Sequence, residues 1–247
     1  FLLAGPAHGY HRHRDPVLYQ RTLEELDRFG PFLRRTGSLR IESSLEDCVL
    51  QAEALRADGF EVQEYDGPEG KGLLFPRDGV FQPLERCRSM ATGPGLYEHS
   101  PALSVSAGRV ITPFGTVSCG SVLVLVDGRL SQLLPEVPVR TVRLQMLGTA
   151  PLPPRYDRPV YLRDGYEYWQ QLPDGRLVLG GFRDVGGSEE ETTSTEPSAL
   201  VQRALYELLS RIAPGAVVTH RWAESGGLTA AGLPVVGAVL PGVWAAG

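Results

Sequence analysis

The sequence predicts a mixed α/β fold in which amphipathic helices alternate with short strands. Three stretches carry apolar residues at the spacing of a helix that buries one face, and they lie at residues 18–29, 44–57 and 199–212. From residue 96 onward, short apolar runs are separated by Gly and Pro, which is typical of strands joined by tight turns. One run, Val122–Val126, is continuously apolar, and such strands belong to parallel sheets that are buried on both faces.

The composition is that of an ordinary globular protein. Of the 247 residues, 42% are hydrophobic and 21% are charged, which excludes a disordered chain. The 24 Lys and Arg against 29 Asp and Glu leave a formal charge of −5, which argues against nucleic acid as a partner. No run approaches the roughly 18 consecutive apolar residues of a membrane helix, so no membrane span is predicted.

The cysteines and histidines follow no known disulfide or metal pattern. The cysteines are Cys48, Cys87 and Cys119, and the clustered histidines are His8, His11 and His13. An odd number of widely spaced cysteines favours free thiols and a reducing, cytoplasmic location. Because no Cys or carboxylate cluster with ligand spacing accompanies the histidines, a polar lead into the first helix is favoured over a metal site.

The first half of the chain begins with two predicted helices. The first runs from Leu18 to Phe29 and is stopped by Gly30-Pro31. Phe32–Ile41 reads as a strand or a hairpin. The second helix runs from Ser44 to Ala57, and Asp47 makes its start resemble a capping box.

The remaining elements alternate between helices, strands and turns. Gly67–Pro83 is rich in turn residues, and Leu84–Met90 starts a short helix. Val139–Thr149 is a strand candidate. A polar loop at Gly186–Pro197 leads into the third long helix, Ala199–Ile212.

A hairpin is predicted around Leu172–Gly175, whose Pro-Asp-Gly sequence suits a tight turn. The flanking strands are Tyr166–Gln171 and Arg176–Phe182. Because side chains alternate along a strand, one face would carry Tyr166, Tyr168 and Gln170 and the other Glu167, Trp169 and Gln171. Tyrosines at alternate positions suit the wall of a small-molecule pocket, but this pattern alone favours an ordinary half-buried strand.

The sequence motifs alone leave the function open. The sequence contains no Gly-x-Gly-x-x-Gly phosphate loop and no Gly-x-Ser-x-Gly nucleophile elbow. Four stretches, however, resemble in order and spacing the flavin-dependent amine and amino-acid oxidoreductases of the D-amino-acid oxidase superfamily, near the glycine oxidase and sarcosine oxidase branch. They are Leu96–Val105, Val122–Gly128, Tyr166–Gly181 and Arg221–Gly237, and Phe1–Gly5 is also similar to a segment of that family.

This resemblance, which covers nearly the whole chain, implies an FAD-binding Rossmann-like domain interleaved with a substrate domain on a mixed, largely antiparallel sheet. Residues 1–30, 76–128 and 220–247 would belong to the FAD-binding domain, and residues 31–75 and 129–219 to the substrate domain. The phosphate loop of the family would lie before Phe1 and a further Gly-rich turn after Gly247. The sequence is therefore expected to be part of a longer enzyme.

The resemblance also implies a reaction and a cofactor. The expected activity is dehydrogenation of the C–N bond of a small amino acid or amine, by hydride transfer to flavin N5 of FAD, followed by hydrolysis of the imine. A homo-oligomer is an open alternative for its assembly. The competing hypothesis is a non-catalytic remnant or binding module of the same fold that does not bind FAD.

Site residues follow from the same resemblance. The residues expected at the cofactor are Phe1, Leu2, Ala102, Asp127, Gly128, Gly227, Leu228 and Gly247. Tyr168 is the expected catalytic residue, lying over the substrate, with Tyr166 and Arg183 at neighbouring substrate-binding positions. Gly226 stands where the family has an Arg that binds the substrate carboxylate, so either Arg183 replaces that Arg or the substrate lacks an α-carboxylate.

Overall fold

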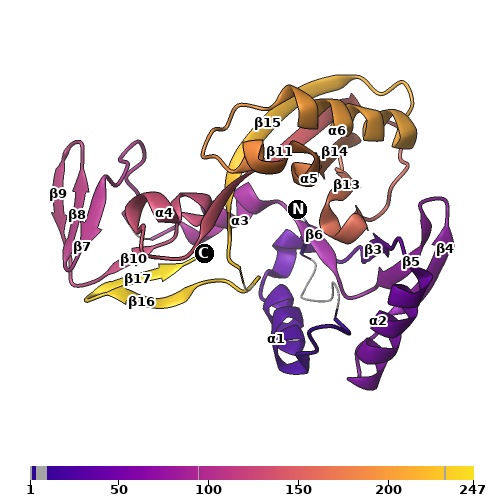
Figure 1. The fold of residues 1–247 in the computed structure, drawn as a ribbon, viewed down its shortest axis with the longest axis horizontal. Coiled ribbons are helices and arrows are strands. Elements are labelled where there is room, and N and C mark those ends of the chain that lie inside the picture. The colour runs from indigo at the N-terminus through magenta and orange to yellow at the C-terminus, as the bar shows by residue number, and fades with distance from the viewer. Residues whose placement is uncertain (1, 4–9, 94, 231) are drawn as a thin grey trace. The chain divides into compact units, whose positions relative to one another are not determined.

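The computed structural model describes residues 2–3, 10–93, 95–230 and 232–247 (Figure 1). The chain divides into two compact units, each built from separate segments. The first unit comprises Phe1–Pro94, Met146–Phe182 and Arg203–His220, and the second comprises Gly95–Gln145, Arg183–Gln202 and Arg221–Gly247. The division into FAD-binding and substrate domains that the sequence predicts uses other boundaries and stays a prediction.

A mixed sheet of eight strands is the largest assembly among the described residues, in the order β15-β11-β14-β13-β12-β3-β5-β4. Its strands are β3 (Ser38–Ile41), β4 (Gln63–Gly67), β5 (Gly70–Phe75), β11 (Arg140–Pro151), β12 (Val160–Leu162), β13 (Glu167–Gln171), β14 (Arg176–Gly181) and β15 (Val218–Leu228). The β12–β3 pair is parallel, whereas β3–β5, β4–β5, β11–β14, β12–β13 and β13–β14 are antiparallel. The predicted α/β fold with a mixed, largely antiparallel sheet is confirmed.

The predicted hairpin is confirmed as β13 and β14. Gly175 closes its turn with φ +88°, a backbone conformation that favours glycine. A Cβ at this position would also come within 2.8 Å of the Leu152 carbonyl oxygen. The turn therefore depends on glycine for two separate reasons.

One position of the hairpin departs from the prediction. Tyr166 precedes β13 and has φ −76° and ψ −9°, at the end of the 3-10 turn Arg163–Gly165. This helical backbone breaks the alternation of a strand, so Tyr166 does not continue the face of Tyr168. Within the strand the two faces differ: Glu167 and Trp169 are buried, while Tyr168 is half-buried.

The segment before the second helix is neither one strand nor a hairpin. β2 (Leu33–Arg34) pairs with β6 (Gly79–Phe81) in a small sheet of the order β1-β6-β2, with β1 at Leu2–Leu3. β3, only a few residues later, pairs with β5 and β12 in the large sheet. The apolar pattern of Phe32–Ile41 predicted extended backbone. It could not show that β2 and β3 have partners in different sheets.

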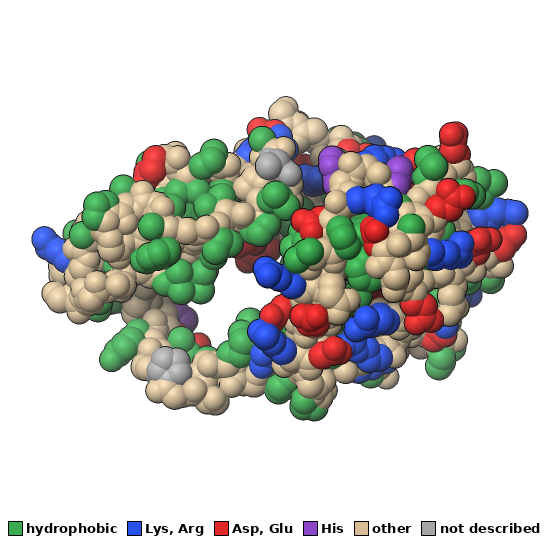
Figure 2. All heavy atoms as spheres, turned by 90° about the horizontal axis from the view of Figure 1, so that it is seen from below, with side chains coloured by type: hydrophobic (Ala, Val, Ile, Leu, Met, Phe, Trp, Pro, Cys, Tyr) green, Lys and Arg blue, Asp and Glu red, His purple; other side chains and the backbone are tan. Residues whose placement is uncertain are grey.

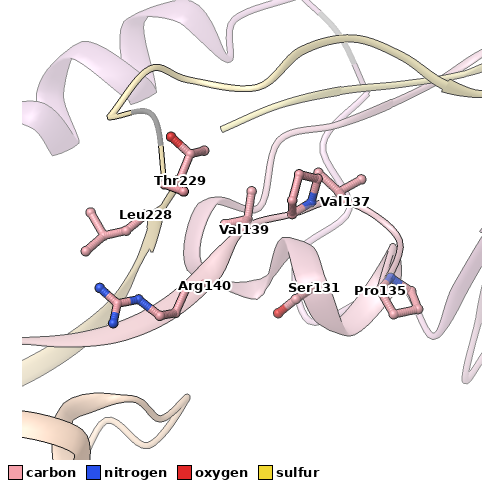
Figure 3. Close-up of a pocket in the computed structure, with 9 residues that line it drawn as sticks. Ser131, Pro135, Val137, Val139, Arg140, Leu228 and Thr229 are labelled. Carbon is pink, nitrogen blue, oxygen red and sulfur yellow. The ribbon is translucent and has the colours of Figure 1, made fainter.

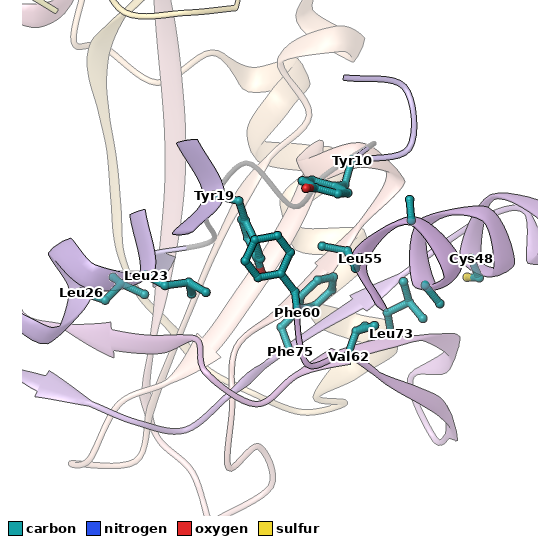
Figure 4. Close-up of a cluster of buried hydrophobic side chains, with 12 residues drawn as sticks. Tyr10, Tyr19, Leu23, Leu26, Cys48, Leu55, Phe60, Val62, Leu73 and Phe75 are labelled. Carbon is teal, nitrogen blue, oxygen red and sulfur yellow. The ribbon is translucent and has the colours of Figure 1, made fainter. Parts of the chain in front are cut away.

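The first unit has a core beneath α1 (Pro16–Asp27) and α2 (Leu45–Ala57) (Figure 4). The helices begin at Asp15 and Ser44, whose side chains accept backbone N–H groups at 2.8 Å and 3.3 Å. The buried core residues are Tyr10, Tyr19, Leu23, Leu26, Cys48, Ala52, Ala54, Leu55, Phe60, Val62, Leu73 and Phe75. Both helix predictions are confirmed to within a few residues, as are those for α3 (Pro83–Met90) and α6 (Ala199–Ile212).

The second unit holds two small sheets and short helical turns. One sheet has the order β10-β17-β16 and the other β7-β8-β9. Their strands are β7 (Ser104–Ser106), β8 (Arg109–Thr112), β9 (Gly115–Ser118), β10 (Val122–Val124), β16 (Val236–Leu240) and β17 (Val243–Ala246). Asp127–Arg129 forms a 3-10 turn that leads into α4 (Leu130–Leu133), and α5 spans Arg183–Gly186. β10 and β17 run parallel, as the apolar run predicted.

The prediction that the Val122–Val126 strand is buried on both faces is wrong. Val122 and Val124 are 7% and 4% exposed, but Leu123 is 62% exposed. Only one face of β10 therefore packs on the core of the second unit. Among the residues that the structure describes, no helix has the length and apolar character needed to cross a membrane.

Candidate functional site

The two parallel strands of the second unit end side by side in a glycine-rich turn. β10 is followed by Asp127-Gly128, and β17 is followed by Gly247. A Cβ built on Gly247 would lie 3.5 Å from the Asp127 Cα atom, so the two strand ends are close neighbours. Ligands of α/β proteins bind at the carboxyl ends of parallel strands, and this edge has that character.

A strand distant in the sequence completes the turn. The Gly227 N–H, in β15, donates to the Asp127 Oδ1 atom at 2.9 Å across 100 residues of sequence. Asp127 itself has a positive φ of 44°. The hydroxyl of Thr141 donates to the Gly128 carbonyl oxygen at 2.7 Å. These bonds hold the Asp127-Gly128 turn against β11 and β15.

Glycine is required in this turn because backbones approach closely. A Cβ on Gly128 would lie 2.5 Å from the Ser225 carbonyl carbon and 2.6 Å from the Gly226 nitrogen. A Cβ on Gly227 would lie 2.9 Å from the Val139 side chain. Gly128 and Gly227 are therefore needed so that segments of this chain can pack closely against one another.

A pocket of about 590 Å³ lies beside this turn in the second unit (Figure 3). It is lined by Ser131, Pro135, Val137, Pro138, Val139, Arg140, Leu228, Thr229 and Ala230. Leu228, one of the predicted cofactor residues, comes from the end of β15, and Val139 precedes β11. Arg140 forms an ion pair with Glu191 at 2.5 Å, so its charge is partly compensated at the rim.

The structure brings together some of the predicted cofactor residues and not others. Asp127, Gly128, Gly227 and Gly247 form one cluster, and Leu228 follows directly in the chain. Ala102 is half-buried in the segment before β7. Leu2 belongs to β1 in the first unit, and Phe1 lies outside the described residues.

The predicted substrate residues lie on different elements. Tyr168 is half-buried in β13, and its ring centroid is 5.6 Å from that of Tyr161 in the neighbouring strand. Its hydroxyl lies 3.5 Å from the Met146 sulfur atom. We call the sheet face that carries Tyr161 and Tyr168 the tyrosine face. Arg183 starts α5 in the second unit.

Sequence reasoning did not identify Tyr161 or Gly180. Gly180 lies opposite Tyr168, and a Cβ there would come within 2.6 Å of the Tyr168 hydroxyl and 2.3 Å of the Met146 sulfur. The glycine therefore makes room for the Tyr168 ring. No short-range pattern marks Tyr161, because its position beside Tyr168 arises from pairing between β12 and β13.

Comparisons with known proteins agree with this architecture. The L-proline dehydrogenase of P. horikoshii is 16% identical, with a TM-score of 0.75 over 96% of this chain and 74% of that one. Glycine oxidase of Bacillus cereus ATCC 14579 is 16% identical, with a TM-score of 0.75 over 99% and 76%. An L-amino acid deaminase of Proteus vulgaris is 15% identical, with a TM-score of 0.71 over 97% and 72%. These likenesses show a shared fold.

No curated protein gives a significant sequence match. The family model described as "FAD dependent oxidoreductase" (DAO), by contrast, matches residues 4–247, which is nearly the whole chain. FAD is the cofactor of that family, and the carboxyl ends of the parallel strands β10 and β17, beside Asp127 and Gly247, are the kind of edge at which α/β folds hold a cofactor. The chain belongs to the DAO family of FAD-dependent oxidoreductases.

Proposed function

We propose that this oxidoreductase acts on the C–N bond of a small amino acid or amine. The observation that carries the proposal is the pair of half-buried tyrosines, Tyr161 and Tyr168, which lie side by side on the tyrosine face. Aromatic rings with hydroxyl groups offer apolar contact area and hydrogen bonds to a small polar molecule. The names of the similar structures, a glycine oxidase, a proline dehydrogenase and an amino acid deaminase, also support an amino acid.

When bound, FAD supplies the acceptor for the two electrons removed from the substrate. The residues proposed to hold it are Phe1, Leu2, Ala102, Asp127, Gly128, Gly227, Leu228 and Gly247. Four of these, Asp127, Gly128, Gly227 and Gly247, lie together in one feature, the turn formed where β10, β15 and β17 meet. This support is independent of the resemblance that suggested the residues.

The chain's own contribution to the reaction is proposed to be binding and orientation. Tyr168 would hydrogen-bond the substrate and hold its C–H bond in a reactive direction, and such positioning can supply several kcal/mol of catalysis. Tyr166 and Arg183 are proposed as further substrate contacts. If the amine is bound neutral, no acid–base pair on the protein is needed.

A flavin spectrum and a substrate panel test this function. The purified full-length protein should show flavin absorption, and under anaerobic conditions this absorption should bleach with one class of amino acid or amine and not with the matching alcohols. A full-length protein that binds no flavin would instead support the alternative of a non-catalytic module. Flavin binding without bleaching by any C–N substrate would reject the proposed reaction.

A further inference from the structure

A second pocket, of about 460 Å³, lies within the first unit beside the end of α6. Leu162 and Trp169 line it from β12 and β13, and they directly follow Tyr161 and Tyr168 in the chain. Because successive side chains of a strand point to opposite faces, this pocket and the tyrosine face lie on opposite sides of the same two strands. We call it the α6 pocket.

The inner wall of the α6 pocket is aromatic and aliphatic. Trp169 is 3% exposed, and its ring meets that of Tyr156 nearly edge to face, with centroids 5.7 Å apart. Leu162, Leu208 and Ile212 also line the pocket. Small-molecule sites commonly have volumes of roughly 300–1,000 Å³ and combine such a wall with a few polar groups. The wall therefore suits the flat body of an aromatic molecule.

One polar atom of this wall lacks a protein partner. The Nε1 atom of Trp169 is buried and has no hydrogen-bond partner among the described residues. A buried donor without an acceptor keeps its desolvation cost. A ligand that brings an acceptor oxygen to this N–H group would remove that cost, whereas a purely apolar ligand would not.

Two exposed arginines give the pocket a positive rim. Arg155 donates from Nη1 to the Ile212 carbonyl oxygen at 2.6 Å and forms no ion pair with any residue that the structure describes. Arg211 is 66% exposed and lies 3.5 Å from a carboxylate oxygen of Glu167. That carboxylate already accepts the Nε–H of Arg163 at 2.5 Å, so it compensates the charge of Arg211 only in part.

The same rim carries one acidic side chain. Glu69 lines the pocket, and its carboxylate accepts the hydroxyl of Tyr65. Among the lining residues, two guanidinium groups therefore stand against one carboxylate, which is already engaged. This balance favours a ligand with negative charge over one with positive charge.

Arg155 also serves the end of α6, but that role leaves most of its donors available. The hydroxyl of Tyr156 donates to the same Ile212 carbonyl oxygen at 2.9 Å, so the end of the helix has two donors. A guanidinium group has five N–H donors, and the Nε and Nη2 atoms of Arg155 have no partner in the described part of the chain. The contact with Ile212 thus holds the guanidinium beside the aromatic wall.

We propose that the α6 pocket is a binding site for a small aromatic anion. The ring of the ligand lies against Tyr156 and Trp169, and its carboxylate, sulfonate or phosphate head is bound at the rim formed by Arg155 and Arg211. Since the tyrosine face is on the other side of β12 and β13, this ligand binds without displacing a molecule there. The site goes beyond the proposed oxidation of a C–N bond and does not depend on it.

Calorimetric titration of the full-length holoenzyme with three probes tests the site. 2-Naphthalenesulfonate has both parts of the expected ligand, 2-naphthalenesulfonamide has a neutral head, and methanesulfonate lacks the ring. The first should bind on the order of 10- to 100-fold more tightly than either of the others, because only it combines ring contact with charge-assisted hydrogen bonds. Equal affinity for the sulfonate and the sulfonamide would overturn the proposal.

Variants of the rim place the probe. Arg155→Met and Arg211→Met should each weaken 2-naphthalenesulfonate binding, and the double variant should bind it no better than the sulfonamide. Arg203→Met, exposed on α6 and outside the pocket, is the matched control. Unchanged affinity in the double variant, or an equal loss in Arg203→Met, would contradict the site. If Arg155→Met fails to fold, Arg211→Met decides, because its side chain is 66% exposed.

Tyr168→Phe separates the α6 pocket from the tyrosine face. This variant should keep the full affinity for 2-naphthalenesulfonate. A loss in Tyr168→Phe with none in the arginine variants would place the probe on the tyrosine face and overturn the proposal. These titrations measure binding alone, so they decide about the pocket even if the holoenzyme oxidises no C–N substrate and the proposed function fails.

Discussion

Tyr168 and Trp169 are neighbours in β13 but differ in how far their side chains are buried. Trp169 is 3% exposed, whereas Tyr168, on the opposite face of the strand, is half-buried beside Tyr161. The half-buried tyrosine keeps access to a ligand while its ring is held by Gly180 and Met146. This combination of order and access is what substrate-binding side chains require.

Tyr168→Phe tests whether that hydroxyl serves the reaction. The change keeps the ring and removes one hydrogen-bonding group, so transition-state stabilisation should fall by about 1–3 kcal/mol, measured as kcat/KM. The melting temperature should change little. Tyr206→Phe, on the exposed surface of α6, is the control. If both variants keep wild-type kcat/KM with the true substrate, Tyr168 is structural.

Glu190 gives a pH-dependent prediction in the second unit. Burial opposes its charge, but hydrogen bonds from Arg143, Gln145 and Ser198 outweigh that effect and lower the pKa of Glu190. A lowered folded-state pKa stabilises the protein above the unfolded value of about 4.3, and this contribution disappears as the pH falls through the folded-state pKa. Glu190→Gln should therefore cost about 1–3 kcal/mol at neutral pH and progressively less in acid.

Denaturant unfolding at several pH values measures this effect. Glu191→Gln is the matched control, because its partner Arg140 is 57% exposed and an exposed pair contributes less than about 1 kcal/mol. A Glu190→Gln penalty that stays constant down to about pH 3 would contradict the assigned ionisation.

The turn between β10 and α4 is constrained by close packing between segments of backbone. It follows a parallel strand, is bonded to β15 through Asp127, and packs glycine against the backbone of Ser225 and Gly226. Backbone atoms cannot move aside as side chains can, so this packing restricts the sequence more than an exposed turn would. The same geometry keeps the ends of β10 and β17 free of side-chain bulk.

Gly128→Ala tests whether the turn between β10 and α4 is part of the FAD-binding site. The new methyl group would lie 2.5 Å from the Ser225 carbonyl carbon, so we expect a loss of about 1–3 kcal/mol in stability and a lower ratio of FAD to protein. Gly120→Ala has no atom within 4 Å of its added Cβ and is the matched control. Normal flavin content in purified Gly128→Ala would argue against this turn as part of the cofactor site.

At the scale of the whole molecule, the two units differ in which kinds of side chain they expose on their surfaces. Figure 2 shows hydrophobic side chains gathered over the second unit, whereas positive and negative side chains are mixed over the first. In the sheet of the second unit, Leu123, Trp244 and Val236 are 62%, 50% and 75% exposed. The pairing of Leu123 with Trp244 places both on one face. An exposed apolar face of this kind favours self-association.

Leu123→Thr should therefore reduce self-association of the 247-residue chain without lowering the stability of its fold. Because Leu123 is already 62% exposed, we expect a change in stability within about 0.5 kcal/mol and less light scattering at high protein concentration. Val124→Thr, which changes a residue that is 4% exposed, should instead lower the melting temperature. Unchanged scattering by Leu123→Thr would show that this face does not drive association.

Local sequence determined the elements of this protein. The helices α1, α2 and α6 follow from apolar spacing and end signals, and the hairpin follows from Gly175, because these features act over a few residues. Strand register determined which residues from distant parts of the sequence lie side by side. Tyr161 meets Tyr168, Arg40 meets Tyr161, and Asp127 meets Gly227 across 100 residues. A strand's alternation assigns its side chains to two faces but does not name the strand that lies alongside, so only the tertiary structure could place these residues side by side.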